Sequence, residues 1–290
     1  MELKRPRSKK SYHQSSSFKG LLNGQRYSGH YDNFSVIVTE GIQELHTKGC
    51  FGKGNFSRGY PSFGTADRPQ IIRKRVFEQR NQVKSTRTRK VIVTPDSDNE
   101  SEYFTNLQPQ YFIDSSALTE TLHLTLEEAY FLSHSLNCLD VYHNRKLLEP
   151  QELWSLFVEN DKYFVQNYAV YLHFRSKNWV VKSGIKFGGD YLLYKEGPAF
   201  YHASYLVIID VLDANSRERK LESCRRSMDI VTLSGLNRLC ETVGKELLIC
   251  QVLWPSDMKE VYHSDLQKLQ ISEVLMRRWV PSENRDLLEY

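Results

Sequence analysis

The sequence lacks long apolar runs, a secretory leader and a strong charge of either sign. No stretch approaches the roughly 20 apolar residues that a membrane-spanning helix needs, so no membrane segment is predicted. The first ten residues contain no apolar core, and we therefore expect no secretory signal. With 39 Lys and Arg against 35 Asp and Glu, the net charge is +4. This mild basicity permits an anionic partner without requiring one.

The cysteines are few, odd in number and widely separated. Five occur in the 290 residues, and no two of them form a Cys-x-x-Cys pair. A disulfide framework and a structural zinc site are therefore not expected. We predict a reduced intracellular protein.

What is present is sufficient for a mixed α/β fold. The chain is 40% hydrophobic and 12% aromatic, and its length suits one large or two small domains. Thr125 and Glu128 form a capping box at the start of a helix, and Pro150 suits a first helical turn. Near-continuous apolar residues at 205–212 predict a strand that is buried on both faces. Helices are predicted at 41–48, 125–136, 151–158, 163–177 and 233–243, and strands at 34–39, 179–182, 191–195, 205–212, 247–253 and 270–280.

Shifts in composition divide the chain into four parts. Residues 1–29 are polar and basic and are predicted to be a disordered tail. A small N-terminal α/β domain is predicted from 30–65 together with 119–158, interrupted by a flexible insertion at 66–118 where apolar periodicity is lost. Residues 159–290 are predicted to be a second domain, of helices around a mixed sheet.

Two segments allow more than one interpretation. Lys4–Lys10 is either a solvated basic tail or a nuclear import signal, and the second interpretation predicts a nuclear protein. The glycine-rich loop at 49–63 contains lysine and arginine, as a phosphate-binding loop does. It lacks the spacing and the Lys-Ser/Thr ending of a P-loop, so we predict a loop pinned to the core by its aromatic residues.

Three side chains in two segments suit phosphodiester chemistry. Tyr194 and His202 lie eight residues apart on either side of a Gly-Pro turn, and Lys245 precedes a second apolar strand. Taken singly, each has a structural interpretation: a core tyrosine, a structural histidine or a solvated lysine. No acidic cluster stands beside them, and the set therefore favours chemistry that needs no metal.

Several motifs, in order along the chain, resemble the tRNA-splicing endonuclease family, most closely its eukaryotic catalytic subunits that cut the 5′ splice site. The resemblance covers about 34–63 and 120–280, and leaves out the tail and the insertion. The matching segments are Lys48–Arg58, Tyr171–Trp179, Lys182–Gly189, Asp190–Gly197, Phe200–Tyr205, Leu236–Arg238 and Val243–Ile249.

The resemblance implies a reaction and a role for each residue. Tyr194, His202 and Lys245 stand at the family's catalytic positions. The implied reaction is attack of a ribose 2′-hydroxyl on the neighbouring phosphorus, which leaves a 2′,3′-cyclic phosphate and a 5′-hydroxyl without a metal or cofactor. Histidine, with an ordinary pKa of about 6.5, can protonate the leaving oxygen, and lysine can stabilise the charge on the phosphorane. Tyr194 either acts as the base or orients the 2′-hydroxyl.

The resemblance also implies a base clamp and partners. Arg238 and Trp279 match two residues that stack on a flipped-out base of the RNA and serve the active site of the partner subunit. The alternatives are a surface charge for Arg238 and a core anchor for Trp279. The implied substrate is precursor tRNA. The implied assembly is a heterotetramer with a second catalytic subunit and two structural subunits, for which the last strands and the 210–222 loop are candidate contacts.

Two other functions compete with this interpretation. The chain could be a non-catalytic RNA-binding scaffold of the same fold, in which case loss of His202 would not affect cleavage. It could also be a DNA nuclease with a related fold, whose acidic residues hold a divalent ion and whose activity EDTA abolishes.

Overall fold

The computed structural model describes residues 6–8, 24–55, 87–92, 109–114, 121–258 and 261–278. The chain divides into two compact units, one made of Met1–Gly52 and His123–Tyr290, the other of Lys53–Leu122. Residues on both sides of the predicted domain boundary at 158 belong to the first unit. The predicted insertion lies within the second.

The second unit contains the short strand β3 (Lys53–Gly54) and an antiparallel pair, β4 (Arg87–Ile92) with β5 (Pro109–Asp114). Two hydrogen bonds join its ends. The Asn55 amide donates to the Thr121 carbonyl, and the Thr121 amide donates to Asn55 Oδ1, both at 3.1 Å. The segment between them therefore leaves and rejoins the fold at one place.

In the first unit, one sheet is formed largely by the N-terminal part of the chain. Its strands lie side by side in the order β6 (Leu122–Leu124), β2 (Ser35–Val38), β1 (Tyr27–Asp32), β7 (Leu139–His143) and β8 (Lys146–Leu147). Helix α1 (Ile42–Gly49) follows β2. Strand β1 is antiparallel to β2 and parallel to β7. It begins within the segment predicted as a tail, because Tyr27 and Tyr31 are buried in this sheet.

Three helices follow, and their starts confirm the capping signals. Helix α3 (Leu126–Tyr130) continues as a π-helical turn, Phe131–Ser135. The Glu128 amide donates to Thr125 Oγ1 at 3.3 Å, and the Thr125 amide donates to Glu128 Oε2 at 3.2 Å, which is the predicted capping box. Helix α4 (Pro150–Asn160) begins at the predicted proline, and α5 (Phe164–Ser176) comes next. Across the described part of the chain, no helix combines the length and apolar character needed to cross a membrane.

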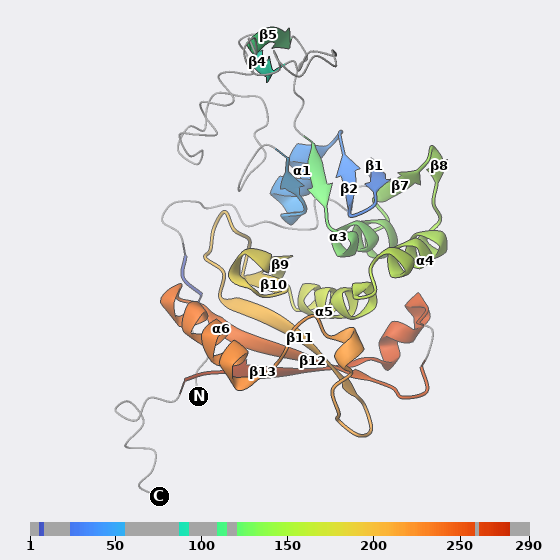
Figure 1. Ribbon diagram of the computed structural model, residues 1–290. Helices are drawn as coiled ribbons and strands as arrows, with labels where there is room; N and C mark the ends of the chain where they lie inside the picture. The colour runs from blue at the N-terminus through green and yellow to red at the C-terminus, as the bar shows by residue number, and fades with distance from the viewer. Residues whose placement is uncertain are drawn as a thin grey trace, which may run out of the picture. The chain divides into compact units, whose positions relative to one another are not determined.

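A second sheet carries the candidate site. Its strand order is β13-β12-β11-β10-β9, as Figure 1 shows. These strands are β9 (Val180–Ser183), β10 (Tyr191–Tyr194), β11 (Tyr205–Asp213), β12 (Glu246–Trp254) and β13 (Gln270–Met276). Strands β11 and β12 are parallel, and helix α6 (Ile230–Thr242) connects them. All other pairs in this sheet are antiparallel.

Helices cover both faces of the central strand β11, as its composition predicted. On one face, Leu206 and Ile208 share a buried cluster with Cys240 of α6. On the other face lies α5. The hydroxyl of Tyr191, in the neighbouring strand β10, donates to the Asn167 carbonyl of this helix. Residues 205–212 are all buried.

The predicted start of α6 at residue 233 is wrong by one turn. Asp229 caps the helix, since its carboxylate accepts from the Thr232 amide at 2.8 Å. Ile230 and Val231, in the first turn, are each 82% exposed. Apolar residues on the solvent side obscured the helical period there.

Candidate active site

The topology of the second sheet brings three chain segments to one edge. Strand β10 runs antiparallel to β11, and β11 runs parallel to β12. The last residue of β10 and the residues just before β11 and β12 must therefore lie at the same edge. Tyr194 ends β10, His202 precedes β11 by three residues, and Lys245 immediately precedes β12. The three predicted catalytic residues thus stand at one edge of the sheet.

Backbone hydrogen bonds connect these three segments directly. The Ser204 amide donates to the Leu193 carbonyl at 2.8 Å, and the Glu246 amide donates to the Ser204 carbonyl at 3.0 Å. Leu193 is next to Tyr194, and Glu246 is next to Lys245. The relative positions of the three segments are therefore set by the sheet rather than by loop conformation.

The turn between β10 and β11 delivers His202 to this edge. Gly197 has a φ of 115°, which a residue with a side chain rarely adopts, and its carbonyl accepts from the amides of Phe200 and Tyr201. His202 is exposed, whereas Ala203 beside it is buried. An exposed imidazole at the mouth of a buried strand is accessible to a substrate.

Lys245 is placed by the end of α6. Gly244 has a φ of 69° and reverses the chain, and the Lys245 amide donates to the Cys240 carbonyl at 2.8 Å. The ammonium lies 4.6 Å from the centroid of the Phe187 ring. Partial burial lowers the pKa of Lys245 below its usual value.

The charge of Lys245 is not neutralised within the described residues, where no carboxylate forms an ion pair with it. Its neighbour Glu246 pairs instead with Arg277, whose Nη2 and Nε lie 2.6 and 3.0 Å from Glu246 Oε1. The lysine therefore remains available to an anion.

Tyr194 is partly buried against an apolar cluster that includes Leu192 and Phe187. Burial raises the pKa of Tyr194 above its usual value. Near neutral pH the phenol therefore stays protonated and can donate a hydrogen bond. Of the two roles left open for this residue, this favours orientation over proton removal.

The glycine-rich Lys182–Gly189 motif shapes the sheet rather than the reaction. A β-carbon placed on Gly189 would lie 2.4 Å from Leu206 Cδ1, so only glycine allows the chain to pass so close to β11. Asp190 then accepts from the Ile209 amide at 2.8 Å and from Arg226 Nη1 at 2.6 Å.

Two cations, one buried and one partly buried, hold the loop at 49–52, and the sequence did not reveal them as partners. Arg175 Nη2 donates to the Gly49 carbonyl at 3.1 Å, and its guanidinium lies 4.5 Å from the Phe51 ring centroid. Lys182 Nζ donates to Glu128 Oε1 at 2.7 Å and to the Gly52 carbonyl at 3.0 Å. We call Arg175, Lys182 and Glu128 the loop anchor.

The loop anchor assigns the Gly-Cys-Phe-Gly loop a structural role. The Gly52 amide donates to Glu128 Oε2 at 3.0 Å, so this backbone N–H is directed at a carboxylate of the protein itself. The aromatic ring at Phe51 is fully buried, as the prediction of a pinned loop requires. The signal available in the sequence was a single arginine within the apolar helix 164–176.

The structure describes only one of the two predicted clamp residues. Arg238 is exposed on α6, and its side chain forms no ion pair within the described segments. Trp279 lies outside the described residues. The clamp therefore stays a prediction.

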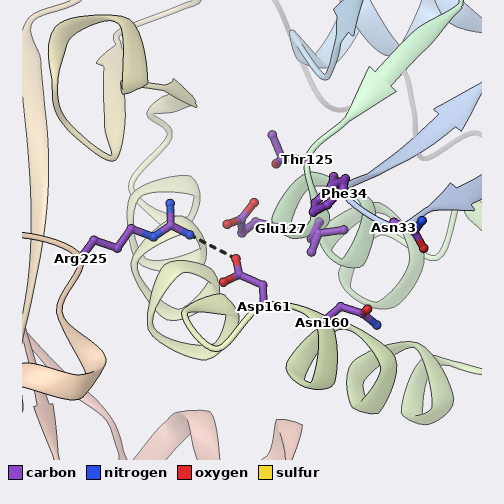
Figure 2. A pocket seen from close by; sticks show the side chains of 8 residues that line it. Asn33, Phe34, Thr125, Glu127, Asn160, Asp161 and Arg225 are labelled. Atoms are coloured by element: carbon purple, nitrogen blue, oxygen red, sulfur yellow. Dashed lines mark hydrogen bonds and ion pairs between the residues drawn. The ribbon is translucent and has the colours of Figure 1, made fainter.

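A separate pocket has a volume of about 310 Å³. Figure 2 shows the side chains that line it. Arg225 at its edge pairs with Asp161 at 3.2 Å, so the cation is already matched by a carboxylate of the chain. None of the three predicted catalytic residues lines this pocket. Its lining consists of Asn33, Phe34, Thr125, Leu126, Glu127, Asn160, Asp161 and Arg225. Over the described residues, no group of three or more His, Cys, Asp or Glu side chains is arranged to hold a metal ion.

Comparison with known proteins shows which family this part of the chain is similar to. Residues 164–262 match the family described as tRNA intron endonuclease, catalytic C-terminal domain. The chain is 44% identical over 169 residues to the tRNA-splicing endonuclease subunit Sen2 of Gallus gallus, a match that covers 57% of this chain and 36% of that protein. It is 36% identical over 185 residues to SEN2 of Saccharomyces cerevisiae, covering 58% and 43% of the two chains.

A third relative matches over more of its length. The probable tRNA-splicing endonuclease subunit sen2 of Schizosaccharomyces pombe is 29% identical over 336 residues, which covers 89% of this chain and 86% of that protein. Against the vertebrate relatives, the match spans about a third of their length. Tyr194, His202 and Lys245 all fall within the matched residues 164–262. Residues 164–262 are therefore similar to the catalytic C-terminal domain of the tRNA intron endonuclease family.

Proposed function

We propose that this chain is a catalytic subunit of a tRNA-splicing endonuclease and cleaves precursor tRNA at the 5′ splice site. The observation that carries the proposal is the shared edge of the second sheet, where Tyr194, His202 and Lys245 meet inside the matched domain. The relatives are named as tRNA-splicing endonuclease subunits, which supports the proposed substrate and assembly.

The proposed reaction is an internal transesterification. The ribose 2′-hydroxyl oxygen bonds to the adjacent phosphorus, the bond from phosphorus to the 5′-oxygen breaks, and a 2′,3′-cyclic phosphate remains. His202 gives its proton to the departing 5′-oxygen, which leaves as a hydroxyl. The nucleophile belongs to the substrate, so the protein has to align it and to stabilise charge.

The other two residues divide those tasks. Lys245, a cation without a carboxylate partner in the described residues, stabilises the negative charge that develops on the phosphorane oxygens. Tyr194, whose pKa is raised by burial, orients the 2′-hydroxyl through its phenol. The proton of the 2′-hydroxyl passes to solvent at this exposed edge.

We further propose that the chain acts in a heterotetramer with a second catalytic subunit and two structural subunits. Strand β13 ends the sheet in the described structure, and its Val274 is 41% exposed. Glu218 and Glu222 are exposed in the 210–222 loop. These two surfaces are the proposed subunit contacts. The Lys4–Lys10 segment is proposed to direct the chain to the nucleus.

The central test compares His202→Ala with His30→Ala, a matched change of an exposed histidine on the other sheet. Each full-length chain is purified from cells with its partners, the partners are identified by mass spectrometry, and cleavage of an intron-containing precursor tRNA is followed by end-group analysis. We expect His202→Ala to lower the 5′ cleavage rate by about 10²- to 10⁴-fold and His30→Ala to have little effect.

The pH dependence and the metal dependence separate the competing functions. With His202 as the acid, the wild-type rate falls as rising pH removes the imidazole proton, and this fall is absent in His202→Ala. Unchanged cleavage by His202→Ala would support the scaffold interpretation. Loss of cleavage in EDTA would support the metal-dependent DNA nuclease.

The base clamp is tested in the same assay. Arg238→Ala is expected to slow one of the two splice-site cuts more than the other, because the clamp serves the active site of a partner. Equal rates at both sites would show that Arg238 is only a surface charge.

A further inference from the structure

Residues 6–8, from the segment predicted as a tail, lie at the catalytic edge. Ser8 forms an antiparallel bridge with Tyr201, and the His202 amide donates to the Arg7 carbonyl at 3.1 Å. Figure 1 shows this short blue segment beside the end of α6. The main chain of the residue before His202, and of His202 itself, is thus paired with the N-terminal segment.

The side chain of Arg7 extends from His202 towards Lys245. A β-carbon placed on Gly244 would lie 3.6 Å from Arg7 Nη1, and Gly244 directly precedes Lys245. One residue therefore contacts the backbone of the proposed acid and approaches the backbone beside the proposed phosphate-binding lysine. Main-chain pairing sets the position of the Arg7 backbone, and this pairing does not depend on the arginine side chain.

The charges at this edge are unbalanced. Arg7 is exposed, and within the described residues neither it nor Lys245 has a carboxylate partner. The nearest acidic neighbour in the sequence, Glu246, is already held by Arg277. Both side chains are cations, so a phosphate bound at this edge would be attracted by two positive charges. Arginine can bind two phosphate oxygens at once, whereas lysine acts as a point charge.

We propose that Arg7 binds the RNA backbone beside the phosphate that is cleaved and, together with Lys245, forms its anion site. The proposal rests on the proposed function and adds a substrate-binding residue to it. The basic tail then has a task at the active site that neither a solvated tail nor an import signal provides.

The test compares Arg7→Gln with Lys9→Gln, which removes the same charge two residues along the same segment. Single-turnover cleavage of precursor tRNA is measured with the complex purified from cells. We expect Arg7→Gln to lower kcat/KM by about tenfold or more and Lys9→Gln by less than about threefold, with unchanged end groups. Arg7→Lys should recover part of the loss, because it keeps the charge but not the planar fork.

A binding measurement separates this proposal from the proposed function. Precursor tRNA with a 2′-deoxyribose at the 5′ splice site cannot undergo the reaction, and its affinity reports on Arg7 even if the wild-type complex cleaves nothing. Weaker binding by Arg7→Gln than by Lys9→Gln supports the proposal. Equal losses would indicate only general attraction to RNA, no loss would exclude the contact, and faster cleavage by Arg7→Gln would show that the segment covers the site.

Discussion

At the scale of single residues, Lys245 and Glu246 are neighbours at the start of β12, but only the glutamate has a charged partner in the described structure. Glu246 forms two short contacts with Arg277, whereas Lys245 has no carboxylate partner in the described structure and a pKa lowered by burial. A lowered pKa means that folding disfavours the charged form of this lysine. The fold therefore bears a cost at this position, a cost that is typical of functional sites.

Lys245→Met is expected to lower activity without lowering stability. Because the folded pKa lies below the unfolded value of 10.5, the charged lysine opposes folding at neutral pH, and this cost diminishes only as pH rises through the folded pKa. Methionine removes the desolvated cation and keeps the apolar stem. We expect a melting temperature equal to or above that of wild type and a loss of cleavage of about 10²-fold or more.

The matched control is Lys268→Met, because the Lys268 side chain is 64% exposed and pairs with Asp265 at the surface. It should leave cleavage unchanged. A marked drop in the melting temperature of Lys245→Met would show that the lysine stabilises the fold and would remove the argument for a functional cost.

The sequence predicted the identities of the candidate residues but not their surroundings. Tyr194, His202 and Lys245 were recognised through motifs, and the sheet places them together. Their surroundings depend on contacts between segments far apart in the chain. Examples are the ion pair of Arg277 with Glu246 and the burial that raises the pKa of Tyr194. Such contacts leave no periodic signal in a single sequence.

At the scale of secondary-structure elements, the loop anchor joins α3, α5 and β9 to the loop at 49–52. Glu128 closes the capping box of α3, accepts from the Gly52 amide and pairs with Lys182. The Glu128 side chain is 4% exposed and that of Lys182 is 18% exposed. One carboxylate therefore satisfies donors from three segments, and losing its cation leaves a buried charge.

Lys182→Met is expected to destabilise the protein by roughly 3–5 kcal/mol, because it leaves the buried Glu128 carboxylate without its cation. Adding Glu128→Gln should restore part of this loss, because the amide oxygen can still accept from Gly52. Urea unfolding of the four proteins in the cycle measures the coupling.

The exposed pair Lys146–Glu152 is the control for that cycle, with side chains 67% and 43% exposed. Its coupling should not exceed about 1 kcal/mol. An equally small coupling at Lys182 and Glu128 would mean that the loop anchor does not hold the loop.

Elements with local signals were predicted, and those defined by distant partners were not. The capping box at Thr125 and the proline at 150 mark helix starts through neighbours in the sequence, and both are confirmed. Strands β1, β6 and β7 were missed. Strands β1 and β7 lie far apart in the chain but pair with each other, and β6 lies beside the distant β2, so these pairings leave no local signal. The start of α6 was predicted late, because exposed Ile230 and Val231 break its pattern.

At the scale of the whole molecule, the chain is interrupted at one well-defined junction. Asn55 and Thr121 form two hydrogen bonds with each other, so the ends of the intervening segment meet. The resemblance to the family resumes at about residue 120. When the two ends of an insertion lie together, its main cost to folding is the entropy lost on closing the loop.

Replacing residues 56–120 with a short Gly-Ser linker is therefore expected to leave the first unit folded. Shortening the loop should raise the free energy of unfolding by up to roughly 2 kcal/mol, and cleavage by the purified complex should persist. Urea unfolding and the cleavage assay measure the two effects. Asn55→Ala within the shortened chain serves as a control, since it removes one of the junction bonds. Loss of the cooperative unfolding transition on shortening would show that the segment supports the fold.

The parallel pairing of β11 with β12 also determines when the candidate site is complete during synthesis. Tyr194 and His202 flank a local hairpin, whereas Lys245 arrives only after α6 has been made. Parallel strands close late because the crossover must be in place first. A ribosome-bound chain that has just exposed its hairpin therefore carries the histidine without the cation. On this order of assembly, the proposed catalytic set is complete only after β12 has been made.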